Sequence, residues 1–517
     1  MQREPFEHES YTDFALAENK RKMKGALNKV SAELGRDYPL VIGGQRIEKE
    51  EKVVSRNPSF PEEIVGRIAR AEEKDVEQAV EAAVKAAQDW KAKDPEERAG
   101  YLYKAAELIR EKRYELAAWM IYEGGKTWEE ADAEVSEAVD FLEYYGRQVI
   151  RVSRPPELET TPGERNTLYR VPLGVGTVIS PWNFPLALVC GPVSAPVVTG
   201  NPVVAKPSNR TPIIAWKFIK ILEEAGFPDG VINFLPGPGK EIGAQLVQHR
   251  EISFINFTGS KETGLKINEM AAEVKPDQKY FKKVIAETGG KDAIIVDRSA
   301  DIEEAVAGII ISAFSYQGQK CSACSRAIIH AEVYDEVVER LVAEAEQLNV
   351  GDCREFETDM GPVIDERALD KILNYIEIGK DEGELLTGGG RVQGLEGFFL
   401  EPTIFGGIES RDRIAQEEIF GPVLACLKAR DFAEAMEIAN DTIYGLVGSV
   451  YTRDRENIEL AKREFQVGTL YFNRPCVGAL MGVNPWGGFK LSGTNAKAMG
   501  PDHLLLFLQG KSVSEVL

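Results

Sequence analysis

From residue 174 onward, short apolar runs typical of strands alternate with segments typical of helices, and this alternation constrains the fold more than any other feature of the sequence. One set of runs lies at residues 174–180, 202–205, 231–235 and 252–257, and a second set lies at residues 293–296, 327–330, 423–427 and 469–472. Strict alternation of strand and helix implies right-handed crossovers and parallel sheets. The sequence therefore predicts an α/β fold with two parallel-sheet lobes and a ligand in the cleft between them.

The segments that flank this alternation are less regular. Residues 1–45 are charged and irregular, whereas apolar residues at helical spacing predict a helix over residues 76–87. Asp94, followed by a proline and two acids, predicts an N-cap and a capping box that open another helix. Residues 148–169 fit either a linker or a pair of protruding strands. The apolar run at residues 504–508 predicts a terminal strand that pairs with another subunit.

Composition excludes several classes of partner. Lys and Arg number 62 and Asp and Glu number 83, so the net charge is −21. Nucleic acids and anionic membranes bind to a concentrated positive face, and neither is expected as a partner. Six cysteines are too sparse for a disulfide scaffold, the start of the chain has no apolar leader, and no apolar run is long enough to cross a bilayer. We therefore expect a cytoplasmic protein.

Cys321 is the candidate nucleophile. It follows an apolar run and a Gly-Gln turn, and the neighbouring Lys320 offers a positive charge. A thiol attacks carbon as thiolate, which requires partial exposure and a nearby positive field or amide donors. The alternative is a buried cysteine that packs as a small apolar residue. Cys321 and Cys324 also form a Cys-x-x-Cys pair, but no second pair at ligand spacing follows and no metal site is predicted.

Three segments are candidates for binding a nucleotide. The glycines at residues 237–243, including Gly239, miss the Gly-x-Gly-x-x-Gly spacing by one residue, so their signal is weak. Ser260 follows a strand and opens a predicted helix, where it either holds a pyrophosphate oxygen or acts only as an N-cap. Lys206, Ser208 and Asn209 follow another strand and offer polar groups for sugar hydroxyls, with an ordinary surface loop as the alternative.

Seven segments, in order along nearly the whole chain, resemble the aldehyde dehydrogenase superfamily. They are Pro-Trp-Asn-Phe-Pro at 181–185, Lys-Pro-Ser at 206–208, Phe-Thr-Gly-Ser at 257–260, Glu-Thr-Gly-Gly-Lys at 287–291, Gly-Gln-Lys-Cys at 318–321, Glu-Ile-Phe-Gly-Pro at 418–422 and Trp-Gly-Gly-Phe-Lys-Leu-Ser-Gly at 486–493. Residues 318–325, 478–488 and 500–507 resemble the 1-pyrroline-5-carboxylate dehydrogenase branch. That branch oxidises L-glutamate γ-semialdehyde, the hydrolysed form of the cyclic imine, to L-glutamate.

The resemblance implies a fold and a division of the chain. The implied fold is α/β, with two Rossmann-like parallel-sheet lobes plus a small β oligomerisation element. Residues 1–147 and 170–286 would form a dinucleotide-binding domain, residues 287–472 a catalytic domain with the nucleophilic cysteine, and residues 148–169 and 495–517 the oligomerisation strands. A homo-oligomer, a dimer or larger, is expected.

The resemblance also implies the catalytic roles. Cys321 would add to the aldehyde, and the Asn183 side chain with the Cys321 backbone N–H would stabilise the oxyanion. Hydride would leave to a nicotinamide ring, and Glu287 would act as the base for the water that hydrolyses the thioester. A surface carboxylate is the alternative for Glu287. Relatives that transfer the acyl group to coenzyme A tend to lack this acid, so a free carboxylate is the expected product.

The coenzyme and substrate residues follow from the same resemblance. Lys206 would reach the adenosine ribose of NAD, Ser260 its pyrophosphate and Glu418 its nicotinamide ribose, with Phe420 beside the nicotinamide ring. Ser208, Asn209 and Gly239 would also bind the coenzyme. Many NAD-preferring relatives carry an acid where this chain has Asn209, so NAD is the first choice and NADP stays open. The substrate carboxylate would be held by Ser322, Gly478 and Ala479, and its aliphatic part by Phe184 and Trp486.

Other functions remain as alternatives at this stage. The nearest is a dehydrogenase for another ω-semialdehyde, such as succinate semialdehyde. A thioesterase without a cofactor would use Cys321, Asn183 and Glu287 alone, and would leave Lys206, Ser260 and Glu418 without a role. A non-catalytic scaffold protein would have no need of Cys321.

Overall fold

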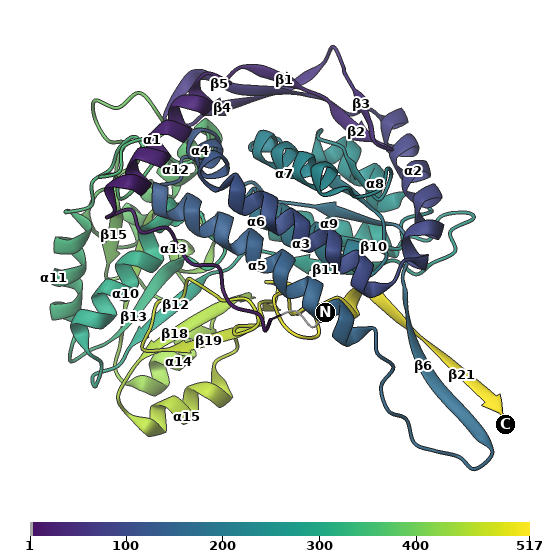
Figure 1. The fold of residues 1–517 in the computed structure, drawn as a ribbon. Helices are drawn as coiled ribbons and strands as arrows, with labels where there is room; N and C mark the ends of the chain where they lie inside the picture. The colour runs from purple at the N-terminus through teal and green to yellow at the C-terminus, as the bar shows by residue number, and fades with distance from the viewer. Residues whose placement is uncertain (1–3) are drawn as a thin grey trace.

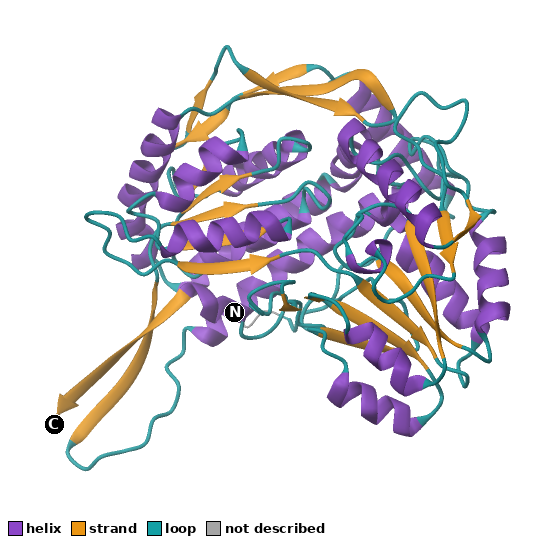
Figure 2. Ribbon diagram, turned by 180° about the vertical axis from the view of Figure 1, so that it is seen from behind, coloured by secondary structure: helices purple, strands orange, loops and turns teal. Residues whose placement is uncertain are grey.

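Two seven-stranded sheets organise the chain, of which a computed structural model describes residues 4–517. The first sheet has, in spatial order, strands β11 (Lys283–Glu287), β10 (Phe254–Thr258), β7 (Gly176–Ile179), β8 (Val203–Lys206), β9 (Ile232–Phe234), β2 (Leu40–Ile42) and β3 (Gln45–Ile47). The second has β14 (Glu384–Thr387), β15 (Thr403–Gly406), β16 (Val423–Ala429), β13 (Cys324–His330), β12 (Asp292–Val296), β18 (Val447–Tyr451) and β19 (Thr469–Phe472). Figures 1 and 2 show the sheets as two lobes covered by helices.

The strands from β7 to β11 run parallel to one another, as do all strands of the second sheet except β14. The predicted α/β fold with two parallel-sheet lobes is therefore confirmed. The two lobes are called the first and the second lobe below, after the sheet that each contains.

Helices cover both faces of each sheet, and alternate residues of a strand enter different cores. In β8, Val203 and Ala205 belong to the core that also contains buried residues of α3 (Pro95–Glu111), α4 (Arg113–Gly124), α5 (Trp128–Val152), α6 (Ala187–Val198) and α7 (Pro212–Ala225). Val204 packs on the other face with α2 (Glu73–Ala92), α8 (Ala244–Gln248) and α9 (Lys261–Ala272). This period of two, with both faces buried, explains why the strands are continuous apolar runs in the sequence.

The second sheet follows the same rule. In β12, Ala293 and Ile295 face a core with α12 (Glu366–Glu382), α14 (Phe432–Asn440) and α15 (Arg455–Glu464), and α13 (Arg413–Gln416) packs beside them. Ile294 and Val296 face α10 (Ile302–Phe314) and α11 (Tyr334–Ala345). A short antiparallel pair, β17 (Tyr444–Gly445) with β20 (Phe489–Lys490), ties the C-terminal segment to this lobe.

Buried carboxylates fix the starts of two helices of the first lobe. Glu134 of α5 accepts hydrogen bonds from the backbone N–H groups of Leu186 and Ala187, at 2.7 and 3.1 Å, where α6 begins. Glu123 of α4 does the same for Ile213 and Ile214 at the start of α7, at 2.9 Å each. The first N–H groups of a helix have no partner within the helix, so these acids satisfy them and favour the helix dipole.

The N-terminal region differs from the prediction. Residues 1–45 were expected to be irregular, but the described part contains α1 (Ala17–Ser31), β1 (Arg36–Tyr38) and β2. Met23, Ala26, Leu27 and Val30 form a buried stripe on α1 at helical spacing, which the many lysines around them obscured in the sequence. We expected no apolar leader at the start of the chain. Residues 1–3 of that segment lie outside the described residues.

β1 belongs to a three-stranded sheet of the order β1-β5-β4, with β4 (Lys52–Asn57) and β5 (Phe60–Ala69). The structure confirms helix α2 and the start of helix α3 at Asp94. The predicted capping box of α3 is wrong, because the Asp94 side chain makes no capping hydrogen bond. Strands β11 and β18 were not predicted.

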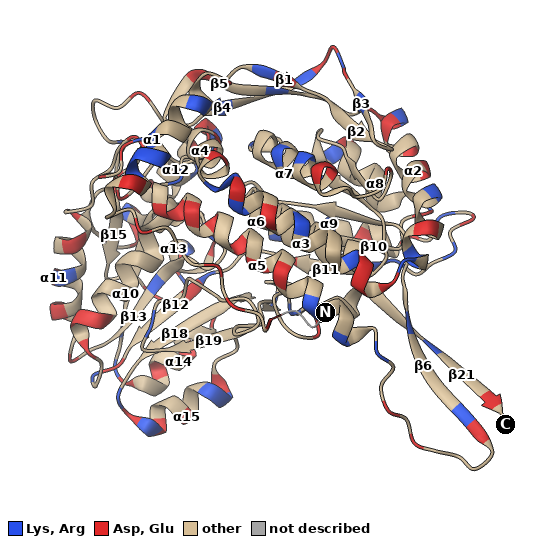
Figure 3. Cartoon of the chain, viewed as in Figure 1, with Lys and Arg blue, Asp and Glu red and all other residues tan. Residues whose placement is uncertain are grey.

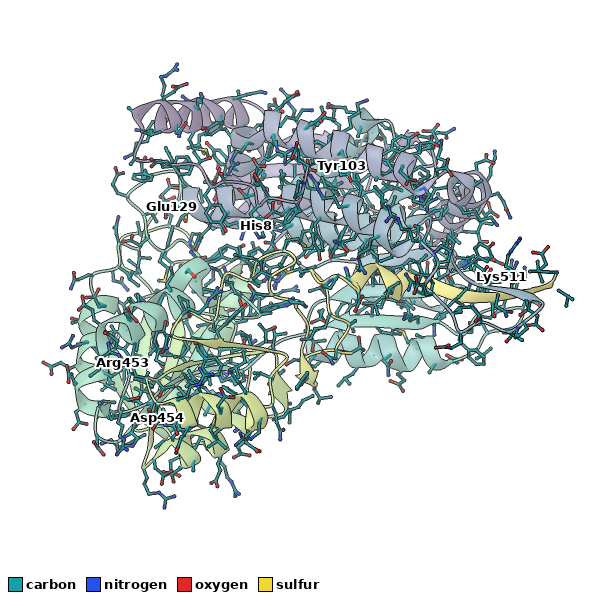
Figure 4. All side chains as sticks on the ribbon, turned by 60° about the horizontal axis from the view of Figure 1, so that its bottom comes forward. His8, Tyr103, Glu129, Arg453, Asp454 and Lys511 are labelled. Carbon is teal, nitrogen blue, oxygen red and sulfur yellow. The ribbon has the colours of Figure 1, made fainter. Side chains whose placement is uncertain are left out.

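A two-stranded ribbon projects from the body and carries the C-terminus at its tip (Figure 1). It pairs β6 (Glu164–Pro172) with β21 (Leu508–Val516) in antiparallel register from Leu508 opposite Pro172 to Val516 opposite Glu164. Lys511 marks it in Figure 4, where it lies at the end of the molecule opposite to Arg453 and Asp454. The strand predicted at residues 504–508 is instead a 3₁₀ turn, His503–Phe507, because Leu504 and Phe507 turn into the core.

Candidate active site

Two cavities meet at the Cys321 side chain. The first, called the interlobe cavity, has a volume of about 1030 Å³ and lies between loops at the carboxyl ends of strands of the first sheet and residues of the second lobe. The second, called the helix cavity, has a volume of about 1530 Å³ and lies between α5, α10 and the loop of residues 477–486. Cys321 lines both cavities, and it is partly exposed. A molecule in either cavity therefore has access to the same thiol.

The structure separates the predicted site residues between these cavities. The interlobe cavity is lined by Asn183 and by all the predicted coenzyme residues, Lys206, Ser208, Asn209, Gly239, Ser260, Glu418 and Phe420. The helix cavity is lined by Glu287 and by all the predicted substrate residues, Phe184, Ser322, Gly478, Ala479 and Trp486. Residues far apart in the sequence thus converge on two adjoining spaces.

The loop that carries Cys321 is held from both lobes. Helix α10 ends at Phe314, and Tyr316 and Gln317 adopt left-handed backbone conformations, with φ of 49° and 56°. The Asn183 side-chain amide of the first lobe donates a hydrogen bond of 2.9 Å to the Gln319 carbonyl, and the Gln319 side-chain oxygen accepts one of 2.9 Å from the Ile364 N–H. Because Gln319 is fully buried, these two bonds fix the position of Cys321.

The electrostatic surroundings of Cys321 differ from the prediction. Burial raises the pKa of the thiol, and the nearby acids Asp292, Glu418 and Glu287 raise it further. Lys320 was expected to supply a positive charge, but its ammonium donates to the Ser315 hydroxyl at 2.7 Å and its pKa is lowered by burial. These surroundings favour the protonated thiol in the free protein.

Glu287 ends strand β11 and faces the helix cavity. One of its oxygens accepts a weak hydrogen bond of 3.4 Å from the Gly488 N–H, and the other, Oε1, is buried without a hydrogen-bond partner in the described chain. Burial raises the pKa of this carboxyl well above its usual range. A carboxyl with a raised pKa is a stronger base than an exposed one and can take a proton from water or a thiol.

The predicted nucleotide residues of the first lobe sit at strand ends. The Lys206 ammonium donates to the Pro207 carbonyl at 3.1 Å, and burial lowers its pKa to about 8. Asn209 accepts a hydrogen bond of 3.1 Å from the Gly237 N–H. Ser260 is the N-cap of α9, where its hydroxyl accepts a hydrogen bond from the Thr263 N–H, and it also lines the interlobe cavity.

Glu418 enters the interlobe cavity from the second lobe. Its Oε1 accepts a hydrogen bond of 3.0 Å from the Gly290 N–H. A Cβ at Gly289 would lie 2.2 Å from the same carboxylate, so a larger residue there would displace the Glu418 side chain. Phe420 has a positive φ of 60° and packs edge to face against Trp182 of the first lobe, with ring centroids 5.5 Å apart. Gly289 therefore makes room for Glu418, and Gly290 makes room for the Cys321 carbonyl and the Asp292 carboxylate.

The predicted substrate residues surround the far side of Cys321. The Lys126 ammonium lies 3.1 Å from the Glu134 carboxylate and 4.0 Å from the centre of the Phe184 ring. This ion pair holds the ammonium against the Phe184 ring. The Gly478 carbonyl accepts a hydrogen bond of 2.8 Å from Arg474. No hydrogen bond to the N–H groups of Gly478 and Ala479 occurs within residues 4–517. Both residues line the helix cavity.

One functional candidate was missed in the sequence. Glu137 of α5 lines the helix cavity, and its carboxyl makes no hydrogen bond within the described chain. Burial and the neighbouring Glu134 raise the pKa of Glu137 to about 8, while Lys126 and Lys320 oppose that rise. The signal was present, because Glu130, Glu134 and Glu137 share one face of α5, where acids recur at helical spacing among buried residues.

Cys324 begins β13 as a buried residue, and no group of Cys, His, Asp or Glu among residues 4–517 is arranged to hold a metal ion. All six cysteines are unpaired.

None of the helices within residues 4–517 is long and apolar enough to cross a membrane. Figure 3 shows Lys and Arg interspersed with Asp and Glu over the helices.

Comparison with known proteins places the chain among relatives that match its full length. The model of the aldehyde dehydrogenase family matches residues 46–513. A 1-pyrroline-5-carboxylate dehydrogenase from Geobacillus kaustophilus is 53% identical over 513 residues, and one from Geobacillus thermodenitrificans is 52% identical, with 99% of each chain covered in both cases. A crystal structure of 1-pyrroline-5-carboxylate dehydrogenase from Thermus with bound NAD superposes with a TM-score of 0.98 at 52% identity, and all of both chains is covered.

The raised pKa of Cys321 predicts how its reactivity depends on pH. Alkylation by iodoacetamide should accelerate about tenfold for each pH unit between 6.5 and 8.5, because the thiolate fraction rises by that factor below the pKa. The rate is measured by mass spectrometry of the tryptic peptide that contains Cys321, in protein without coenzyme. The Cys321→Ser variant, whose other cysteines are buried, should lose the fast phase of labelling. A rate that levels off below pH 7.5 would contradict the electrostatics described here.

Proposed function

The chain belongs to the aldehyde dehydrogenase family, and we propose that it oxidises L-glutamate γ-semialdehyde, the hydrolysed form of 1-pyrroline-5-carboxylate, to L-glutamate with NAD as coenzyme. The observation that carries this proposal is the meeting of two cavities at one thiol, each lined by a different set of predicted residues. Identity above 50% over the whole length to enzymes of this activity supports the choice of substrate.

The interlobe cavity fits a dinucleotide. Lys206 holds a buried ammonium whose described hydrogen-bond partner is one carbonyl, so two of its protons remain for ribose hydroxyls. Glu418 lies closely over Gly289, with its second carboxylate oxygen free for hydroxyls of the other ribose. The residues that would hold NAD are Lys206, Ser208, Asn209, Gly239, Ser260, Glu418 and Phe420. When bound, its nicotinamide ring supplies a hydride acceptor. The uncharged Asn209 would not repel a 2′-phosphate, so NADP remains a second coenzyme to test.

Cys321 would form a covalent bond to the aldehyde carbon. The thiol must first lose its proton, and the thiolate then adds to the carbonyl carbon to give a thiohemiacetal. The Asn183 amide keeps one N–H on the Gln319 carbonyl, and the second N–H, with the Cys321 backbone N–H, would stabilise the oxyanion. Each such donor stabilises the transition state by about 3 kcal/mol. Loss of hydride from the same carbon leaves a thioester.

Glu287 would complete the cycle as a base. Its free Oε1 and raised pKa suit it to take a proton from the water that attacks the thioester. Hydrolysis returns the Cys321 thiol and releases a carboxylate. The same carboxyl would accept the thiol proton at the start, since it faces the cavity that Cys321 also lines.

The helix cavity suits a substrate with both charges of an amino acid. Ser322 and the free N–H groups of Gly478 and Ala479 would hold the α-carboxylate. Glu137 on the α5 side of the cavity would pair with the α-ammonium, which would lower the pKa of this carboxyl from about 8. Phe184 and Trp486 would enclose the aliphatic part.

The projecting ribbon would join subunits into a homo-oligomer. Both outer edges of the β6 and β21 pair are open, and an isolated two-stranded ribbon is marginal in water. Val516 and Leu517 at its tip are 83% and 73% exposed, which is unusual for apolar side chains. We retain the division of the chain that the resemblance implied, with residues 148–169 and 495–517 as oligomerisation strands. Six unpaired cysteines support a location in the reducing cytoplasm.

Substrate specificity tests the proposal. We expect kcat/KM for glutamate γ-semialdehyde to exceed that for succinate semialdehyde and propanal by at least tenfold, because only the first substrate satisfies both Ser322 and Glu137. Ser322→Ala should raise KM for glutamate γ-semialdehyde about tenfold, the value of one charge-assisted hydrogen bond, and should change KM for propanal less than twofold. Equal effects on both substrates would refute the anchoring role of Ser322, and a preference for succinate semialdehyde would refute the proposed substrate.

The oligomer is tested by removing β21. Light scattering after gel filtration should give a mass of at least two subunits for the full chain. Deletion of residues 509–517 should reduce that mass, because β6 loses its partner strand along the whole ribbon. A full chain that elutes as a monomer, or a deletion variant of unchanged oligomeric mass, would contradict this role of the ribbon.

A further inference from the structure

Two side-chain contacts link the lobes across the interlobe cavity. Arg210 of the first lobe forms an ion pair with Asp365 of the second, with 2.7 Å between Nε and Oδ2. Trp182 of the first lobe packs edge to face on Phe420 of the second, at 5.5 Å between ring centroids. The Arg210 guanidinium also lies 5.4 Å from the centre of the Trp182 ring. All four side chains line the cavity, so these contacts form one group at its wall.

Both ends of the ion pair are held in place. The Arg210 N–H donates to the Ser208 hydroxyl at 3.2 Å, which fixes the backbone after strand β8. Asp365 is the N-cap of α12, and its Oδ1 accepts a hydrogen bond of 2.8 Å from the Ala368 N–H. One carboxylate oxygen therefore caps the helix while the other binds Arg210. A pair with both partners fixed loses less conformational entropy than two free surface side chains.

Each residue of the ion pair is next in the chain to a residue of the candidate active site. Arg210 directly follows Asn209, one of the residues assigned to the coenzyme. Asp365 directly follows Ile364, whose N–H fixes Gln319 in the loop that carries Cys321. Separation of the lobes at this point would displace a nucleotide residue on one side and the support of the nucleophile loop on the other.

We propose that the Arg210–Asp365 ion pair, supported by the Trp182–Phe420 contact, is an interlobe clasp that slows dissociation of the coenzyme. This inference rests on the proposed use of NAD. A molecule that contacts both Lys206 and Glu418 spans the two lobes, and it leaves most readily when they separate. Arg210 and Asp365 are positioning residues in this account, since they act by holding the lobes together.

The direction in which one substitution changes the NADH dissociation rate distinguishes a clasp from a simple effect of charge. NAD and NADH carry negative phosphates, so removal of a carboxylate from the cavity wall should, by charge alone, slow their dissociation. The clasp predicts the opposite for Asp365, because its loss frees the two lobes. Asp365→Asn is a suitable change, since asparagine caps a helix as well as aspartate does.

Glu366 supplies a matched control. It is the next residue of α12 and lines the same cavity, yet its side chain has neither an ion pair nor a hydrogen bond among the residues described. Glu366→Gln therefore removes the same charge from nearly the same place without breaking a contact between the lobes.

The experiment measures NADH dissociation by stopped-flow fluorescence, with excess NAD to displace the bound NADH. Arg210→Gln and Asp365→Asn should each raise the dissociation rate about threefold, as expected for a fixed, partly exposed ion pair, and Glu366→Gln should not raise it. The double variant should dissociate no faster than the faster single variant, because both changes break the same contact. The increase should become smaller in 1 M salt, where the pair is screened in the unmodified protein as well.

Other results would overturn the clasp. An Asp365→Asn rate equal to or slower than that of the unmodified protein would show that only charge acts at this position. Multiplicative effects in the double variant would show that Arg210 and Asp365 act separately, for example through direct contact of Arg210 with a phosphate. If NADH does not bind to the unmodified protein, the proposed coenzyme is refuted. That result differs from failure of the clasp, in which NADH binds but the variants do not release it faster.

Discussion

The fixation of Gln319 from both lobes is the interaction on which the site depends. Its carbonyl is bound by the Asn183 amide and its side-chain oxygen by the Ile364 N–H. The thiol two residues later is thereby held where two cavities meet, although its loop contains two residues in left-handed conformations. Buried hydrogen bonds of this kind are costly to break, so the loop keeps its strained geometry.

A second constraint is the concentration of buried acids around the thiol. Glu287, Asp292 and Glu418 all have raised pKa values because burial disfavours their charged forms. Burial of Cys321, and after it these acids, favour the protonated thiol until a base accepts its proton, which slows oxidation and alkylation of the free protein. Such groups reduce stability, and their presence at one place is typical of a site shaped for chemistry rather than for folding.

Much of the fold and of the site residues could be predicted from the sequence. Continuous apolar runs identify β8 and β12 because both faces of each strand are buried, and the motif residues converge on the two cavities. Local sequence patterns gave wrong or missing predictions where tertiary contacts determine the secondary structure. Lys283 and its neighbours obscured strand β11, and the turn at residues 503–507 exists because Leu504 and Phe507 reach the core. The Arg210–Asp365 pair joins residues 155 positions apart, and no local pattern indicates it.

The central claim is that Cys321 carries the acyl group between the two cavities. The most direct measurement is the mass of the Glu287→Gln variant after acid quenching of a reaction with NAD and glutarate semialdehyde, which has no amine that would cyclise onto the thioester. The account predicts one acyl group per subunit, on the Cys321 peptide, in amounts that match the NADH produced and at a lower rate than in the unmodified protein, because the glutamine of this variant cannot take the thiol proton. NADH formation without an adduct on Cys321, or with an undiminished rate in the Cys321→Ala variant, would contradict it.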